Sequence, residues 1–390
     1  MATIAIIGAG LMGRLLALSL NRQGYQVTLF DKDQKNGQQS AAYAAAGLLT
    51  PLGEAIHCPA NIVAMGFAAL SLWPKLLSTL SGYSYFQQAG SIVVSHQQDI
   101  GDYQRLSRFL ANQYPEHQQQ AINRQQLTAL EPELAVRFSQ ALYLPTEGQI
   151  DNRLLLQALE QQLRAENVTW FSESEVIEIK NKTFNTGCDI RWQTSPPNRN
   201  NQWQTFDLAI DCRGIGAKVS TSLQLSTQHN AELADLRAVR GELFHLFAPE
   251  VNISRPVRLM HPRYQLYIAP KNNGHYVVGA TEIESDDSAP MTVRSAMELL
   301  SAAYSVHAGF AEANIRQHVS QLRPAFSDNQ AKIIGDNALI QVNGLYRHGF
   351  LIAPIVLAQV IEHVDNLLLQ QKKPLEHYKY GHWLPISTSN

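Results

Sequence analysis

The sequence predicts a mixed α/β protein in which a discontinuous Rossmann-like domain is interrupted by an inserted antiparallel sheet with helices. Two observations support this fold class. A β-α-β unit of about thirty residues opens the chain, but the next buried-strand signals come only at residues 168–180. A β-hairpin signal in the second half of the chain belongs to no β-α-β unit and indicates a separate antiparallel sheet.

Three consecutive segments make up the β-α-β unit. Residues 3–7 (TIAII) are a short, β-rich apolar run that ends at a glycine, which predicts a buried strand. A helix is expected to follow and to end at Gly24, a residue suited to closing it. Residues 25–30 (YQVTLF) predict a second buried strand, which finishes at Asp31.

The chain after Asp31 departs from a simple run of β-α units. Residues 32–40 are polar, and a helix is expected at about residues 61–80. Buried-strand signals resume at residues 168–180 and 206–217. The nucleotide-binding domain is therefore expected to be assembled from segments that are far apart in the sequence.

The inserted segments carry the signals of an antiparallel sheet. Residues 90–95 (GSIVVS) are strand-like. Residues 264–281 predict a hairpin around Asn273-Gly274, a pair suited to the positive φ angles of a tight turn. Residues 195–202 (SPPNRNNQ) are expected to be an exposed loop between two further strands.

Composition excludes several classes of protein. The 390 residues have a net charge of -2 and no basic block, so binding to nucleic acid is not expected. The longest apolar stretches, residues 62–73 and 350–361, are shorter than the roughly 18 residues that a membrane span requires. Three distant cysteines, no metal-ligand pattern and no secretory signal at residues 1–13 favour a cytoplasmic protein without disulfides or bound metal.

A glycine motif follows the first strand and opens the first helix. Gly8-x-Gly10-x-x-Gly13 fits the dinucleotide fingerprint, in which glycines permit a tight turn, close approach to a pyrophosphate and close helix–strand packing. The positive end of the helix attracts the diphosphate. Asp31, 21 residues after Gly10, is placed to accept hydrogen bonds from a ribose. The motif does not distinguish NAD from FAD.

Two features favour FAD. A discontinuous domain suits a long cofactor that contacts several chain segments. Residues 344–354 (GLYRHGFLIAP) also place glycines and a cation before a helix expected to begin near Ala353. The positive end of that helix would stabilise the negative charge of a reduced flavin at its N1/C2=O edge. Read alone, the segment is better explained as a glycine-containing loop before an ordinary amphipathic helix.

Five segments together resemble a known family: GAGLMGRLLA, AAAGLLTP, residues 267–304, LRPAFSDN and GLYRHGFLIAP. They look like the FAD-dependent amine and amino-acid oxidase (D-amino-acid oxidase-like) family, and within it most like the glycine oxidases of thiamine biosynthesis. The resemblance runs from residue 3 to about residue 370 and is most specific in residues 264–304 and 322–354.

The domain division expected with this resemblance is discontinuous. An FAD-binding domain would comprise residues 1–82, 147–222 and 332–375, a substrate-binding domain residues 83–146 and 223–331, and a C-terminal tail residues 376–390.

The resemblance also implies the site residues. Arg323 would bind the substrate carboxylate, Tyr267 would hydrogen-bond it, and Arg347 would lie at the edge between substrate and flavin. The residues expected to contact FAD are Gly8, Gly10, Gly13, Asp31, Ala45, Ala46, Gly47, Leu48, Val176, Gly214, His348, Gly349, Phe350 and Leu351. The sarcosine-oxidase branch of this family commonly attaches flavin through a cysteine near the C-terminal motif. No cysteine follows Cys212 here, so the flavin is expected to be noncovalent.

The residue types fit these roles, although each also has a plainer interpretation. The planar fork of an arginine suits a carboxylate in an apolar pocket, but Arg323 could instead form an ion pair with Asp328. Arg347 could be a solvated arginine at a helix start, and Tyr267 a core tyrosine of an alternating strand. His348 could be a structural histidine in a packed loop.

The implied reaction is the oxidation of glycine, with sarcosine or small D-amino acids as further substrates. A hydride would pass from the substrate Cα to flavin N5. The imine would hydrolyse to glyoxylate and ammonia, and O₂ would be reduced to H₂O₂. The alternatives are a D-amino-acid dehydrogenase that passes electrons to a quinone, and a flavoprotein acting on another amine, as in tRNA modification. A homotetramer is expected by resemblance alone.

Overall fold

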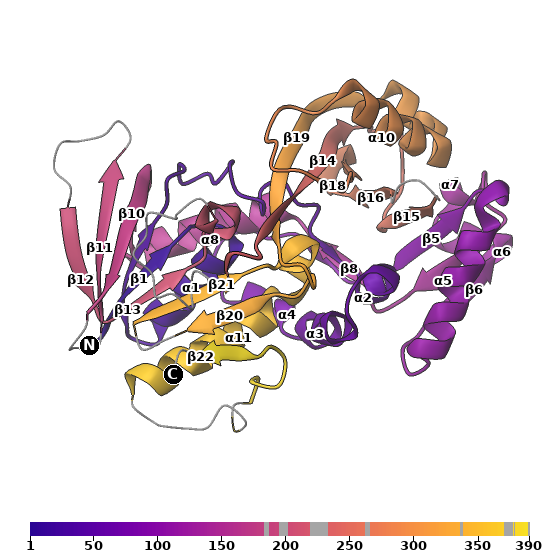
Figure 1. The fold of residues 1–390 in the computed structure, drawn as a ribbon. Helices are drawn as coiled ribbons and strands as arrows, with labels where there is room; N and C mark the ends of the chain where they lie inside the picture. Colours follow the sequence, from indigo (N-terminus) through magenta and orange to yellow (C-terminus); the bar gives the residue numbers. More distant parts are fainter. Residues whose placement is uncertain are drawn as a thin grey trace.

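Two large sheets organise the chain (Figure 1). The computed structural model describes residues 1–182, 187–194, 202–218, 233–261, 266–335, 338–369, 377 and 379–388. One sheet has seven strands and is mostly parallel, and the other has nine strands and is mostly antiparallel. The predicted mixed α/β fold is confirmed. Residues 195–201 of the expected exposed loop lie outside the described residues.

The seven-stranded sheet is built around the predicted β-α-β unit. Its order is β22 (Ile386–Thr388), β20 (Lys332–Gly335), β21 (Leu339–Asn343), β13 (Leu208–Asp211), β1 (Thr3–Ile7), β2 (Gln26–Phe30) and β9 (Thr169–Phe171). All neighbours are parallel except β20 and β21. The crossover helix α1 (Leu11–Arg22) joins β1 to β2. The sheet therefore combines strands from both ends and the middle of the chain, as the discontinuous pattern predicts.

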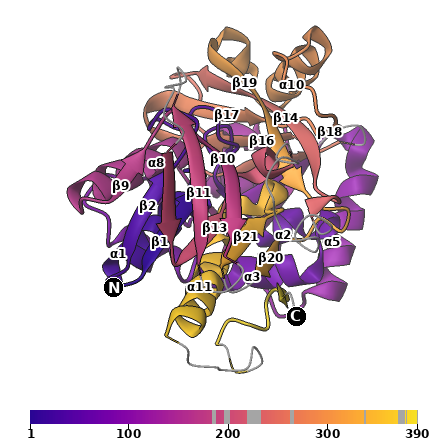
Figure 2. The same ribbon diagram turned by 60° about the vertical axis from the view of Figure 1, so that its left-hand side comes forward.

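Side-chain alternation along β1 separates two apolar layers. Ile4 and Ile6 pack with α1, α3 (Ala60–Leu70), α8 (Asn152–Ala165) and α11 (Gly349–Leu368). Ala5 and Ile7 pack with the antiparallel sheet of β10 (Ser174–Asn181), β11 (Cys188–Thr194) and β12 (Gln202–Phe206). Figure 2 shows this small sheet in front of β1 and β13. Successive strand residues point to opposite faces, so β1 is buried on both sides.

Two helix boundaries differ from the sequence prediction. The expected helix at residues 61–80 is two helices, α3 and α4 (Trp73–Leu77), because Pro74 has no N–H to continue the first. The helix expected near Ala353 begins at Gly349, so Pro354 lies inside α11. Pro354 leaves the carbonyl of Phe350 without its helical partner, and the indole Nε1–H of Trp73 donates to that carbonyl at 3.0 Å. A tertiary contact thus allows the helix to begin earlier.

α11 is the longest apolar helix in the described part of the chain. Residues Tyr346–Leu368 are long and apolar enough to cross a membrane, which the apolar stretches counted in the sequence were not. However, 61% of the apolar window is buried inside the protein, where α11 packs against α1 and α3. A buried core helix meets the same criterion, so this helix is weak evidence for a membrane span.

The nine-stranded sheet holds the predicted hairpin. Its order is β18 (Ile283–Glu284), β14 (Arg237–Phe247), β17 (His275–Gly279), β16 (Leu266–Pro270), β15 (Val257–Met260), β5 (Ser91–Ser95), β7 (Gln140–Leu144) and β6 (Gln120–Asn123), with β19 (Asn314–Ala325) paired to β14. Asn273 and Gly274 have φ angles of 58° and 72°, which confirms the predicted turn. In Figure 1, β14 and β19 run side by side from this sheet toward the seven-stranded sheet.

Helices and a small sheet complete this part of the molecule. α10 (Val293–Val306) packs on the nine-stranded sheet, and the remaining helices are α2 (Pro51–Glu54), α5 (Ile100–Gln113), α6 (Arg124–Leu130) and α7 (Pro132–Ala135). The small sheet has the order β3 (Leu48–Leu49), β8 (Gly148–Ile150) and β4 (Phe86–Gln87).

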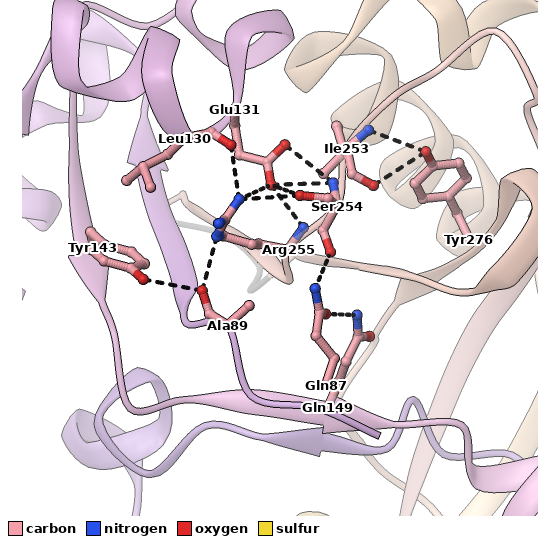
Figure 3. A network of polar contacts seen from close by, with 10 residues as sticks. All are labelled: Gln87, Ala89, Leu130, Glu131, Tyr143, Gln149, Ile253, Ser254, Arg255 and Tyr276. Carbon is pink, nitrogen blue, oxygen red and sulfur yellow. Dashed lines mark hydrogen bonds and ion pairs between the residues drawn. The ribbon is translucent and has the colours of Figure 1, made fainter. Parts of the chain in front are cut away.

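A polar network fastens this small sheet to the loop that leads into β15 (Figure 3). The buried carboxylate of Glu131 forms an ion pair with Arg255 at 3.1 Å and accepts from the Ser254 hydroxyl at 2.6 Å. Gln87 of β4 donates to the Ser254 carbonyl at 2.8 Å, and Gln149 of β8 donates to Gln87 at 2.9 Å. These contacts fix the loop before β15 relative to the small sheet. The first strand of that sheet, β3, directly follows residues 44–47, which line the cavity described below.

Candidate active site

A cavity of ≈ 330 Å³ is lined by residues of both large sheets. Every residue that was expected to contact FAD or the substrate lines it, except Gly13. The predicted residues in the lining are Gly8, Gly10, Asp31, Ala45, Ala46, Gly47, Leu48, Val176, Gly214, Tyr267, Arg323, Arg347, His348, Gly349, Phe350 and Leu351. Segments from across the chain therefore converge on one site.

A side chain would have different consequences at each of the three glycines after β1. Gly8 has a φ of +97°, and a Cβ there would lie 2.8 Å from the backbone of Cys212. A Cβ on Gly13 would lie 1.8 Å from the carbonyl oxygen of Gly8. A Cβ on Gly10 would meet nothing closer than Ser40 at 4.0 Å. Gly8 and Gly13 are thus required by the turn itself, whereas Gly10 leaves space on the cavity side.

Asp31 closes this end of the cavity. Its carboxylate accepts hydrogen bonds from the backbone N–H groups of Ala9 and, at 2.7 Å, Asp33. Burial raises the pKa of Asp31, against the lowering effect of these hydrogen bonds. A carboxylate offers about four acceptor sites, so acceptor capacity remains for a ribose hydroxyl. Val176 lies nearby at an irregularity in the pairing of β10 with β11.

The middle of the cavity is lined by the segment before β3. Gly47 has a φ of +69°, and a Cβ there would come within 2.1 Å of the Ile150 carbonyl oxygen. The ammonium group of Lys271 donates to the carbonyls of Ala46 at 2.8 Å and Ile150 at 2.9 Å. This lysine joins the hairpin of the nine-stranded sheet to the cavity wall. On the other side, the Gly214 carbonyl accepts from the Asn343 amide at 2.9 Å.

The start of α11 lines the cavity. Its N-cap residue, His348, makes no side-chain capping bond, and the next three residues line the cavity. The first N–H groups of a helix have no partner within it and carry partial positive charge. His348 itself is buried, and this burial lowers its pKa to about 4, so the ring is neutral at neutral pH.

Arg323 and Tyr267 lie close to each other and to Arg347 in the cavity wall. Within the described part of the chain, Arg323 has no ion pair, and its Nη1 donates to the Thr281 carbonyl at 3.1 Å. The sequence left open an ion pair between Arg323 and Asp328, but the Asp328 carboxylate instead accepts a hydrogen bond from the Gln330 backbone N–H at 3.0 Å. Burial raises the pKa of Tyr267, which remains a neutral phenol. An unpaired guanidinium beside a phenol is suited to binding one carboxylate.

Arg347 is neither solvated nor free. Only 13% of its side chain is exposed. Its Nη1 donates to Glu282 at 2.8 Å, and its Nη2 lies 2.7 Å from Glu54, an ion pair without hydrogen-bond geometry. Burial lowers the pKa of Arg347, but these two carboxylates outweigh burial and raise it. The structure thus places Arg347 in the cavity wall with its charge already compensated.

Several residues at the site were not among those predicted from the sequence. Glu54 pairs with Arg258 as well as Arg347, and Glu282 accepts from the Tyr346 hydroxyl at 2.6 Å. Glu282 and Tyr346 lie within the family-like segments, but these residues come from separate elements, and only the tertiary structure shows that they contact one another. Arg14, in the apolar α1, offered a weak signal. It is buried and donates to the carbonyls of Ala9, Leu156 and Lys35 at 2.7, 2.7 and 2.8 Å.

Comparison with known proteins identifies the family. Residues 3–361 match the model for FAD dependent oxidoreductases (DAO). The chain belongs to this family. It is 33% identical over 371 residues to ThiO, a Rhizobium etli protein named as a thiamine biosynthesis oxidoreductase, with 95% of this chain and 98% of the relative covered.

Solved structures of the DAO family share the fold. Glycine oxidase from Geobacillus kaustophilus superimposes with a TM-score of 0.77 at 20% identity, covering 98% of both chains. Iminodiacetate oxidase from Chelativorans sp. BNC1 superimposes with a TM-score of 0.74 at 21% identity, covering 99% of this chain and all of that one. The arrangement of one mostly parallel and one mostly antiparallel sheet is therefore that of the family.

The cavity of this family member fits FAD on three features of the structure. Gly10 leaves space at the start of α1, where a diphosphate binds. Asp31 keeps acceptor capacity at the end of β2. The N-terminus of α11, whose macrodipole is positive, lines the cavity. FAD is thus the cofactor, and its flavin is expected beside α11 and its adenosine beside Asp31.

Proposed function

We propose that this FAD-dependent oxidoreductase oxidises glycine, with sarcosine or small D-amino acids as further substrates, by oxidative deamination. The observation that carries this proposal is Arg323, which lines the cavity, has Tyr267 nearby and forms no ion pair with any residue that the structure describes. Two names support it: the Rhizobium etli relative is named for thiamine biosynthesis, and a protein of the same fold is a glycine oxidase. The imine product would be hydrolysed to glyoxylate and ammonia, and the activity would serve thiamine biosynthesis in the cytoplasm.

The chain's own residues bind and orient the substrate. Arg323 would take the carboxylate in a two-pronged contact, and Tyr267 would donate its phenolic hydrogen to the same group. Together they would fix the Cα–H bond relative to the start of α11, which converts binding energy into orientation. FAD supplies the acceptor for the hydride, two electrons and a proton, that leaves Cα. The resulting imine would be hydrolysed by water, and we propose O₂ as the final electron acceptor.

The proposed domain division follows the two sheets. Residues 1–82, 147–222 and 332–375 would form the FAD-binding domain, and residues 83–146 and 223–331 the substrate-binding domain. The C-terminal tail expected at residues 376–390 contributes β22 to the seven-stranded sheet, so its strand packs with the FAD-binding domain. The flavin would be noncovalent, since no cysteine follows Cys212 in the sequence. Treatment with acid should therefore release intact FAD into solution, whereas flavin retained on the denatured chain would contradict noncovalent binding.

Anaerobic reduction by glycine tests the proposed function. The purified protein is expected to be yellow, and glycine without oxygen should bleach its visible flavin band. Oxygen consumption with glycine, compared with reduction of an artificial acceptor by D-alanine, then distinguishes an oxidase from a quinone-linked D-amino-acid dehydrogenase. If neither glycine nor sarcosine bleaches the flavin, the proposed reaction is wrong.

A further inference from the structure

The substrate end of the cavity has an uneven balance of charge. Among the described residues lining it, Arg258, Arg323 and Arg347 are cationic, and Glu54 and Glu282 are anionic. His348 is neutral because burial lowers its pKa to about 4. The surplus is one positive charge. Glu54 pairs with both Arg258 and Arg347, and Glu282 pairs with Arg347. The surplus positive charge therefore belongs to Arg323.

The two carboxylates hold Arg347 in different ways. Glu54 is shared, because one of its oxygens pairs with Arg258 and the other with Arg347. Glu282 serves Arg347 directly: one oxygen accepts from Arg347 Nη1 at 2.8 Å, and the other accepts from the Tyr346 hydroxyl at 2.6 Å. The Glu282 side chain is 50% exposed, and Arg347 is 13% exposed. Glu282 thus covers Arg347 on its more open side.

We propose that Glu282, together with Glu54, restricts the substrate to amines with a single carboxylate. The glutamates neutralise Arg347, so a second carboxylate on the substrate finds no free cation there. It meets two negative groups instead. Rejection by like charge is an ordinary means of specificity. This inference rests on the proposed amino-acid oxidation, and it assigns to Glu282 a role in substrate choice and none in the reaction itself.

Glu282→Gln tests the inference by exposing the charge of Arg347. The substrates are glycine, iminodiacetate, which carries a second carboxymethyl group on its nitrogen, and D-aspartate. We expect the kcat/KM ratio of each dicarboxylate to glycine to rise about tenfold, which corresponds to about 1.4 kcal/mol. This is a modest value because Glu282 is partly exposed and solvent screens its charge. An unchanged ratio would overturn the assignment.

Two further variants separate charge from shape. Glu282→Asp keeps the negative charge and should keep the wild-type ratio. Glu284→Gln removes a neighbouring charge that pairs with Arg237 on a side chain 66% exposed, and it does not line the cavity. Its ratio should equal that of the wild type. If Glu284→Gln raised the ratio as much as Glu282→Gln, the effect would come from general charge, and the inference would be wrong.

A binding measurement keeps this test independent of turnover. Acetate and malonate, which carry one and two carboxylates, can be titrated against the oxidised holoenzyme by following the flavin spectrum. Glu282→Gln should lower the Kd of malonate relative to that of acetate by about tenfold. If neither glycine nor sarcosine reduces the wild-type flavin, the proposed function is wrong but this ratio can still shift. If glycine reduces it and the ratio does not shift, only the role of Glu282 is wrong.

Discussion

The guanidinium of Arg323 lies over the backbone of Gly241 on the neighbouring strand β14, two residues along from Val239, the residue that pairs with Arg323 in the ladder. A Cβ added to Gly241 would fall 2.2 Å from the Arg323 Cζ atom. β14 and β19 pair in antiparallel register through this region, so neither backbone can move away without breaking the ladder. The missing side chain at residue 241 is therefore what allows the guanidinium to lie where a substrate carboxylate can reach it.

Gly241→Ala should displace the guanidinium of Arg323 without removing its charge. A misplacement of about 1 Å at a binding group can cost on the order of a hundredfold in rate, so kcat/KM for glycine should fall at least tenfold. FAD content should stay unchanged, because the glycine turn lies elsewhere. Steady-state kinetics and flavin absorbance measure both. Gly101→Ala, where an added Cβ meets nothing within 4 Å, is the matched control.

Arg323→Ala tests the proposed carboxylate contact itself. Removing one partner of a buried charge pair costs about 2 to 5 kcal/mol. At about 1.4 kcal/mol per tenfold, kcat/KM for glycine should fall roughly thirty-fold to a few thousand-fold. Glycine amide lacks the anionic carboxylate, so preference for glycine over its amide should shrink. Equal losses for both compounds, with poor flavin retention, would mean that Arg323 is structural.

The glycine turn predicts two different phenotypes. Gly10→Val places a side chain where the cavity is open, so it should abolish FAD binding and leave the apoprotein folded. Gly13→Val drives a side chain into the Gly8 carbonyl, so it should lose both FAD and thermal stability. FAD occupancy and the melting temperature of the apoprotein distinguish the two. If the Gly10→Val protein kept its full FAD content, the diphosphate would not bind at this position.

The indole of Trp73 and the ring of Pro354 are linked through the Phe350 carbonyl. Trp73→Phe removes the donor at 3.0 Å, and an unsatisfied buried acceptor costs about 1 to 3 kcal/mol. Pro354→Ala restores a helical N–H to that carbonyl. Trp73→Phe should therefore destabilise the Pro354→Ala protein less than the wild type, by about 1 kcal/mol. Urea unfolding of the four proteins measures this coupling, and strictly additive effects would contradict it.

Local patterns predicted the fold where the chain's physics is local. The strand at residues 3–7, the Asn273-Gly274 hairpin and the discontinuous sheet follow from side-chain periodicity and turn chemistry. The start of α11 did not, because a proline normally ends a helix and the compensating donor, Trp73, is far away in sequence. A tertiary hydrogen bond of this kind has no signature within the helix itself.

The candidate site shows the same limit. Motifs located the glycine turn, Asp31 and Arg323, which the structure brings to one cavity. Glu54 and Glu282 were not predicted as site residues, although Glu282 lies within the family-like residues 264–304, and their importance arises from proximity to Arg347. Charge compensation is a property of the folded cavity, so it could not be predicted from residue spacing.

Behind the cavity wall, Glu147 is a buried carboxyl with an unusual environment. One oxygen accepts from the Gly53 N–H at 2.8 Å and the other from the Ser91 hydroxyl. Burial raises its pKa to about 7, even though these hydrogen bonds and the charge of Arg258 lower it. Gly53 precedes Glu54 in α2, so Glu147 holds the element that carries a cavity carboxylate.

The raised pKa of Glu147 predicts a specific dependence of stability on pH. The unfolded pKa is about 4.3, so between about pH 4 and pH 7 the folded protein binds the extra proton. The stability that the protonated Glu147 carboxyl contributes is fully present below about pH 4. It is lost as the pH rises to about 7, which lowers the free energy of unfolding by about 2 to 4 kcal/mol.

Glu147→Gln cannot ionise and should lack this loss. The unfolding free energy of the wild type minus that of Glu147→Gln, measured in urea, should therefore fall between pH 5 and pH 8. The exposed Glu116→Gln should leave the wild-type pH dependence unchanged, and a wild-type-minus-Glu147→Gln difference that is the same at both pH values would show that Glu147 does not titrate there.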